Sequence, residues 1–142
     1  MITIAKAIYD YFKPCPLLDN GCIRVDYLGP GDSGVEYAIE LTPGSQIIKR
    51  YIDGATLRQQ EFLFACRYFY GADIMQNLAN SGFFDELSNW IEHSSDAGIL
   101  PVLDDGRESR KMEALTCGYL LSEDGQTARY QIQCRFIYHK EA

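Results

Sequence analysis

The most regular pattern of hydrophobic and polar positions lies near the end of the chain, in residues 128–138. Every second residue there is apolar and the residues between are polar, which is typical of a β-strand with one buried and one exposed face. We therefore predict a strand with one face in a hydrophobic core and one face in water. The apolar set comprises Ala128, Tyr130, Ile132, Cys134, Phe136 and Tyr138. The polar set comprises Arg129, Gln131, Gln133 and Arg135.

The same period of two predicts five earlier strands. They lie around residues 22–27, 35–41, 47–51, 62–70 and 115–121. The fourth carries Phe62, Phe64 and Cys66 on one side and is expected to be a long central strand. Between the last two strands of the chain, residues 122–126 contain Asp-Gly, which is typical of a hairpin turn. These two strands should therefore pair antiparallel.

Spacings of three and four predict helices at two places. Ile4, Ile8, Tyr11 and Phe12 give the N-terminal segment one apolar side, and the following prolines end this helix.

A second helical region is predicted to begin near Asp73. Asn-Ser-Gly at residues 80–82 is expected to interrupt it, and a second stretch continues through residues 84–91 and ends before Gly98. The polar residues 104–110 then predict an exposed loop.

These segments follow in the order α-β-β-β-β-α-β-β, which predicts an α+β fold with a mainly antiparallel sheet and helices on its apolar face. A chain of 142 residues can bury one hydrophobic core, so residues 1–142 are expected to form a single domain. The expected core residues are Phe62, Phe64, Trp90, Tyr130, Ile132 and Phe136.

Residues 27–37, YLGPGDSGVEY, contain the pattern G-x-G-x-x-G at Gly29, Gly31 and Gly34. In dinucleotide-binding proteins this pattern joins a strand to a helix whose free N–H groups hold the phosphates. Here the apolar alternation continues on both sides of the glycines, and Pro30 has no N–H to donate. We therefore expect a β-hairpin or an irregular connection without a phosphate-binding role.

The formal net charge is −7. Nucleic-acid backbones and anionic membranes attract positive surfaces, so this charge disfavours both and favours protein partners. The N-terminus lacks a secretory signal pattern and no apolar stretch is long enough to span a bilayer, which predicts a soluble protein made in the cytosol. Five cysteines without C-x-x-C spacing are expected to be reduced, with Cys66 and Cys134 in the core.

Few residues suggest catalysis. The two histidines are His93 and His139, and no Ser or Cys stands in a local nucleophile motif. Asp104 and Asp105 lack the twelve-residue pattern of a calcium-binding loop and are expected to be solvated. We therefore assign no catalytic, cofactor-binding or metal-binding residue.

The polar side of the last strand allows two interpretations. Antiparallel sheets commonly leave one face in water, which favours solvation. Arginine and amide side chains also pair well across protein interfaces, which favours a contact surface. The residues concerned are Arg129, Gln131, Gln133 and Arg135.

Three phrases occur in the second half of the chain: NSGFF with WIE at residues 80–84 and 90–92, the Leu100-Pro101 stop, and ARYQIQC at residues 128–134. In these phrases the chain resembles a family of prophage proteins from Gram-positive bacteria. Their genes lie among the head–tail joining and tail genes, often under the label minor capsid protein, and the proteins look like tail terminators.

The resemblance implies a terminator-like fold and structural work in virion assembly. Terminators of long-tailed phages form a ring, usually a hexamer, that stops growth of the tail tube and presents a surface to the head connector. The implied partners are further copies of the chain, the tail tube protein and the head–tail connector protein, with no sequence-specific nucleic acid and no membrane. The implied location is the host cytoplasm during assembly and then the tail or neck of the virion.

Two alternatives stay open. The first is another head–tail completion or neck protein from the same gene cluster. The second is a small acyl- or nucleotide-transferring enzyme, which only the glycine pattern and the two histidines suggest.

Overall fold

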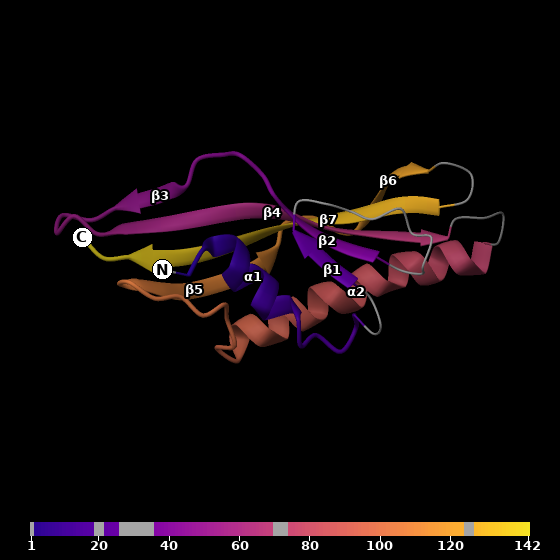
Figure 1. Ribbon diagram of the computed structural model, residues 1–142, viewed down its shortest axis with the longest axis horizontal. Helices are drawn as coiled ribbons and strands as arrows, with labels where there is room; N and C mark the ends of the chain where they lie inside the picture. Colours follow the sequence, from indigo (N-terminus) through magenta and orange to yellow (C-terminus); the bar gives the residue numbers. More distant parts are fainter. Residues whose placement is uncertain (1, 19–21, 26–35, 70–73, 124–126) are drawn as a thin grey trace.

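The computed structural model describes residues 2–18, 22–25, 36–69, 74–123 and 127–142 (Figure 1). Within these ranges two helices and seven strands form an α+β fold, which confirms the predicted class. The helices are α1 (Ile4–Phe12) and α2 (Ile74–Asp96). The strands are β1 (Cys22–Val25), β2 (Glu36–Leu41), β3 (Ile47–Arg50), β4 (Thr56–Phe69), β5 (Arg107–Ala114), β6 (Tyr119–Glu123) and β7 (Thr127–Lys140).

The described strands belong to one sheet built around β4 and β7, which are 14 residues long each. These two strands pair antiparallel over their whole length, from Thr56 opposite Lys140 to Phe69 opposite Thr127. β2 and β3 pair with different parts of β4, and β5 and β6 pair with different parts of β7. Two long strands thus form the centre of the sheet, with shorter strands along both sides (Figure 1).

Both helices pack on the same face of this sheet, because their buried residues join those of β4 and β7 in one core. The expected core residues Phe62, Phe64, Tyr130, Ile132 and Phe136 are all buried, which confirms the predicted face of both long strands. Trp90 is only partly buried, and its ring lies 5.0 Å from that of Tyr11 and 5.9 Å from that of Phe12. The cysteines expected in this core, Cys66 and Cys134, are fully buried and are not in a disulfide.

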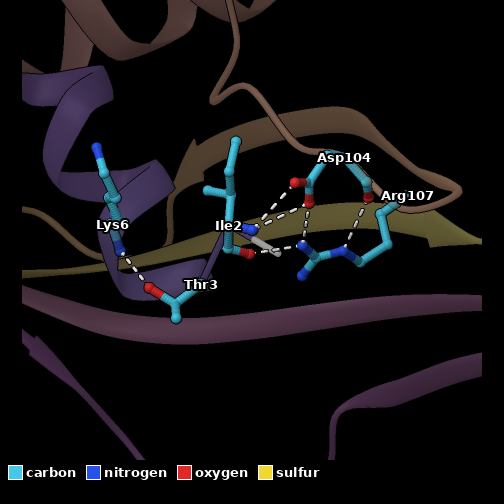
Figure 2. Close-up of polar contacts among 5 residues, drawn as sticks. All are labelled: Ile2, Thr3, Lys6, Asp104 and Arg107. Carbon is cyan, nitrogen blue, oxygen red and sulfur yellow. Dashed lines mark hydrogen bonds and ion pairs between the residues drawn. The ribbon is translucent and has the colours of Figure 1, made fainter.

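The predicted N-terminal helix is confirmed as α1, and a residue before it supplies the cap. The Thr3 hydroxyl accepts the Lys6 backbone N–H at 3.1 Å, which satisfies a donor that the first helical turn leaves free (Figure 2). Ile8 and Phe12 are completely buried. The helix ends before Pro14, as expected.

The N-terminal segment is held by Asp104, just before β5, and by Arg107, the first residue of β5 (Figure 2). The Ile2 N–H donates to both carboxylate oxygens of Asp104 at 3.1 Å, and the Arg107 guanidinium donates to the Ile2 carbonyl. Arg107 also pairs with Asp104 at 2.9 Å. The expectation that Asp104 is merely solvated was therefore wrong, because this carboxylate joins the start of α1 to the start of β5.

The expected interruption of the second helix was wrong, because α2 runs through residues 80–82 as one helix of 23 residues. Glycine inside a helix costs about 1 kcal/mol relative to alanine. Burial of Phe84, Leu87 and Ile91 stabilises the helix by about 1.5–3 kcal/mol each, which outweighs that cost.

The expected end of α2 is confirmed at Gly98. This residue has φ of 78°, a left-handed conformation that glycine adopts without strain. Its N–H donates to the Ser95 carbonyl at 3.1 Å, and the Ile99 N–H donates to the Ser94 carbonyl at 2.8 Å. These two bonds form a Schellman motif that satisfies carbonyls of the last turn.

The expected exposed loop at residues 104–110 was wrong in part, because Arg107 begins strand β5. β5 lies at the edge of the sheet beside β7, so most of its side chains reach water and can be polar. A bulge between Ser109 and Lys111 also breaks the alternation of apolar and polar residues. This strand adds an element to the predicted order.

β1 and β2, the strands on either side of the glycine pattern, are both present as predicted, but they pair parallel. A hairpin joins antiparallel strands, so of the two expected alternatives the hairpin was wrong, and the irregular connection stays a prediction. The glycines themselves lie outside the described residues, and the phosphate question at residues 29–34 stays a prediction.

Candidate functional site

The four polar residues of β7 lie on the sheet face opposite the helices. Because Ile132, Cys134 and Phe136 of β7 point into the core, the residues between them point to the other side. We call this side of the sheet, with the side chains that it carries from β2, β4, β5, β6 and β7, the outer face. The structure confirms that the four polar residues of β7 share it: Arg129, Gln131, Gln133 and Arg135.

Arg129 crosses the outer face to another strand. Its guanidinium pairs with both carboxylate oxygens of Glu40 on β2, although the two residues are 89 positions apart in sequence. The Arg129 side chain is 16% exposed and that of Glu40 is 26% exposed. β4 lies between these two strands, and its residue Ala65 is small and fully buried.

Gln131 is buried, with 5% of its surface exposed, so the expectation that this whole side is wet was wrong at this residue. Its amide nitrogen donates to the Tyr119 hydroxyl at 2.5 Å, and its amide oxygen accepts from Arg129 at 3.1 and 3.3 Å. Tyr119 lies on β6 directly opposite Gln131. A polar group that loses water needs such partners, and Gln131 has them on both ends of its amide.

Gln133 is the exposed member of the set. Its amide nitrogen donates to the same Tyr119 hydroxyl at 3.2 Å. Its backbone N–H donates to the Thr116 hydroxyl at 3.2 Å and its carbonyl accepts from the Leu115 N–H at 2.7 Å. The segment between β5 and β6 therefore fixes the backbone of Gln133 while its side chain reaches water.

Arg135 forms a second charged group on the outer face. Its Nε donates to Glu113 of β5 at 2.7 Å and its Nη1 donates to the amide oxygen of Gln59 on β4 at 3.2 Å. Glu113 also pairs with Lys111 at 3.2 Å. Burial opposes ionisation of Glu113, but hydrogen bonds and charges from Arg135 and Lys111 outweigh burial and lower its pKa.

A hollow of about 280 Å³ lies between these two charged groups. Gln131 and Gln133 line one side of it, Glu61 and Leu63 of β4 line another, and Leu115 lies at its rim. Leu115 is 41% exposed. The outer face thus offers a partner a shallow depression with apolar and amide walls and a charged pair on either side.

The other candidate residues do not gather into a reactive site. His93 is exposed in the last turn of α2, and His139 lies on β7 with its ring 5.7 Å from that of Tyr51. Within the described ranges, no group of three or more His, Cys, Asp or Glu residues is placed to hold a metal ion. The charged groups that the fold does bring together are the pairs Arg129–Glu40 and Arg135–Glu113. The sequence could not reveal these pairs because their members come from different strands.

Comparison with protein-family models finds none that matches this chain, and comparison with curated proteins finds no match either. Neither described helix is long and apolar enough to cross a membrane.

Proposed function

We propose that this chain is a structural protein of phage assembly, a tail terminator that forms a ring on the end of the tail tube and joins it to the head connector. The observation that supports this proposal most is the outer face. It carries charged and amide side chains on a broad sheet, and most of them are already held by partners on neighbouring strands.

Preformed side chains suit a contact surface because binding then loses little side-chain entropy, which otherwise costs about 0.5–1.5 kcal/mol for each long side chain that a contact immobilises. Arg129 and Arg135 are held by carboxylates of β2 and β5, and Gln131 by Tyr119. The hollow between them gives a partner side chain a place to enter.

Gln133 and Leu115 are the residues that we expect to touch a partner directly, because both are exposed beside the hollow. Arg129, Gln131 and Arg135 act mainly by shaping the surface. The expected partners are further copies of the chain, the tail tube protein and the head–tail connector protein. The assignment to a terminator rests on the resemblance in residues 80–92 and 128–134.

Deletion of the gene from an inducible prophage tests this proposal. Electron microscopy of the lysate should show filled heads beside overlong or unjoined tails, and the gene supplied on a plasmid should restore joined particles. Tails of normal length that fail to join heads would favour another neck protein over a terminator. Normal virions would contradict any role in tail completion.

A further inference from the structure

The hairpin formed by β3 and β4 carries an exposed apolar tip. Ile52 is fully exposed, and Ile48 and Tyr51 are 45% and 37% exposed. The turn itself is ordered by hydrogen bonds: the Tyr51 N–H donates to the Ala55 carbonyl at 2.9 Å, and the Asp53 carboxylate accepts from the Ala55 N–H at 2.9 Å. A well-formed turn therefore holds a large apolar side chain in water.

The hairpin is basic in a chain that is acidic overall. Residues 47–58 contain Lys49, Arg50 and Arg58 against the single acid Asp53, whereas the whole chain has a net charge of −7. Arg50 is exposed, and its guanidinium has no hydrogen bond or ion pair among the described residues. Figure 1 places the hairpin tip at one end of the molecule, beside the C-terminus and beyond both helices.

A groove of about 360 Å³ lies beside the contact between the C-terminal half of α2 and the edge strand β5, where the Met112 N–H donates to the Ser95 hydroxyl at 3.3 Å. Ser88 and Ser95 of α2 line one wall, and Ala114 and the buried Met112 of β5 line the other. Its walls thus combine small polar side chains with a little apolar surface. No described residue of the β3–β4 hairpin lines the groove of its own chain.

The groove is acidic where the hairpin is basic. Glu92 and Asp96 of α2 line it, both are exposed, and neither has an ion pair within the described part of the chain. The other charged residues of the groove, Lys111 and Glu113, pair with each other at 3.2 Å. Two uncompensated carboxylates therefore face the opening.

We propose that the basic tip of the β3–β4 hairpin of one copy binds in the α2–β5 groove of a second copy. Ile52 lies in the groove beside the α2–β5 contact, and Arg50 pairs with Glu92 and Asp96. The charges of the two surfaces are complementary, and the exposed isoleucine loses water in the contact.

Because the hairpin and the groove are different surfaces of one chain, each copy can give its hairpin to one neighbour and its groove to another, which makes the proposed contact heterologous. Repetition of a heterologous contact generates a closed ring when the rotation between copies closes. This inference rests on the proposed function: if the chain forms a ring on the tail tube, the hairpin–groove contact joins neighbouring copies in that ring.

Sedimentation analysis of the purified chain over a range of concentrations tests the contact. We expect association that weakens as salt rises, because the charged pairs are exposed. Arg50→Glu and the pair Glu92→Arg with Asp96→Arg should each weaken association by at least about tenfold, and the combination of all three changes should restore it. Lys13→Glu makes the same charge change on exposed surface after α1 and should leave association unchanged.

A mixture of two variants tests the direction of the contact. A chain with Arg50→Ala and Ile52→Ser loses the hairpin contact but keeps a normal groove, and a chain with Glu92→Arg and Asp96→Arg keeps a normal hairpin. The unchanged chain should form assemblies larger than a dimer, whereas the mixture should stop at a dimer of the two chains, because an uncharged hairpin has no attraction for a basic groove. An unchanged chain that itself stops at a dimer, as a reciprocal contact would give, would contradict the proposal.

Two other results would also contradict it: a chain that stays monomeric up to about 1 mM, or association that survives Ile52→Asp and is lost with Leu121→Asp on the edge strand β6. The outcome is separate from that of the proposed function. Association without a tail defect would leave the contact standing and remove the terminator role. A tail defect without association would do the reverse.

Discussion

The two faces of β4 and β7 are built from alternating residues of the same strands, yet their interactions differ. The inner face packs aromatic and aliphatic side chains such as Phe64 and Ile132 under two helices, and these side chains are completely buried. The outer face carries charged residues and amides that pair across strands, such as Arg129 with Glu40.

The two faces therefore contribute differently to the stability of the fold and to the shape of its surface. Burial of a large apolar side chain stabilises the fold by about 1.5–3 kcal/mol. An ion pair that is partly exposed contributes about 0–1 kcal/mol, because water and salt compete with it. The inner face therefore holds the chain folded, and the outer face mainly fixes where its charges lie.

The largest expected effect comes from the inner face. Phe64→Ala should lower the free energy of unfolding by about 3–5 kcal/mol, because Phe64 is completely buried between Phe12 and Tyr37. Leu63→Ala, one position away on the outer face, should cost roughly 1 kcal/mol. Urea unfolding measures both. A loss below about 1 kcal/mol for Phe64→Ala would show that the faces are assigned wrongly.

A smaller effect tests how closely α2 packs against the segment between β5 and β6. A Cβ atom on Gly118 would overlap the Cβ of Phe84, so Gly118→Ala should cost about 1–3 kcal/mol. Gly82 lies in the middle of α2, and a Cβ atom added there would meet no other atom within 4 Å, so Gly82→Ala should instead stabilise the protein by roughly 0.5–1 kcal/mol. Equal effects of both changes on thermal stability would mean that no close contact exists at Gly118.

On the outer face, a double-mutant cycle should measure the Arg129–Glu40 pair. We expect a coupling of about 0.5–1 kcal/mol for Arg129→Met with Glu40→Gln, since both side chains are partly exposed. The coupling should shrink in high salt. A coupling of several kcal/mol would place this pair among the main stabilising contacts and remove the contrast between the two faces.

The smallest expected effect concerns Asp104 and depends on pH. Hydrogen bonds from the Ile2 N–H and from Arg107 lower the pKa of Asp104 below its ordinary value. Its stabilising contribution is therefore present above about pH 3.9, the unfolded value, and is lost as the pH falls through the folded pKa. Asp104→Asn should destabilise the chain at pH 7 and make little difference in strong acid. Asp85→Asn, which removes an exposed carboxylate of α2, serves as the control.

The sequence predicted the elements whose pattern is governed by burial. β7 alternates because one face of it meets the core, and α1 has one apolar side because it lies on that core. β4 was predicted only from residue 62 because its first residues, 56–61, are mostly polar. β5 was missed because an edge strand with a bulge buries few of its residues. The continuity of α2 was missed because local propensity at Gly82 is outweighed by packing elsewhere in the helix.

The four site residues were correctly placed on one side of β7, but their surroundings were not predictable. Arg129 meets Glu40 from 89 positions away, and Arg135 meets Gln59 from 76 positions away. Such pairs depend on which strands are neighbours, and that order is set by the whole sheet. The parallel pairing of β1 with β2 was missed for the same reason, since alternation does not encode strand direction.

The most direct test of the outer face as a contact surface is a pair of variants in the prophage that lacks the gene. Gln133→Arg places bulk and charge beside the hollow of the outer face, and Pro16→Arg places the same group on exposed surface after α1, away from both the hollow and the α2–β5 groove. Both proteins should fold with similar melting temperatures. Tail lengths and head attachment, counted by electron microscopy, should be normal with Pro16→Arg, whereas Gln133→Arg should leave overlong or unjoined tails. Normal particles with Gln133→Arg would contradict the account.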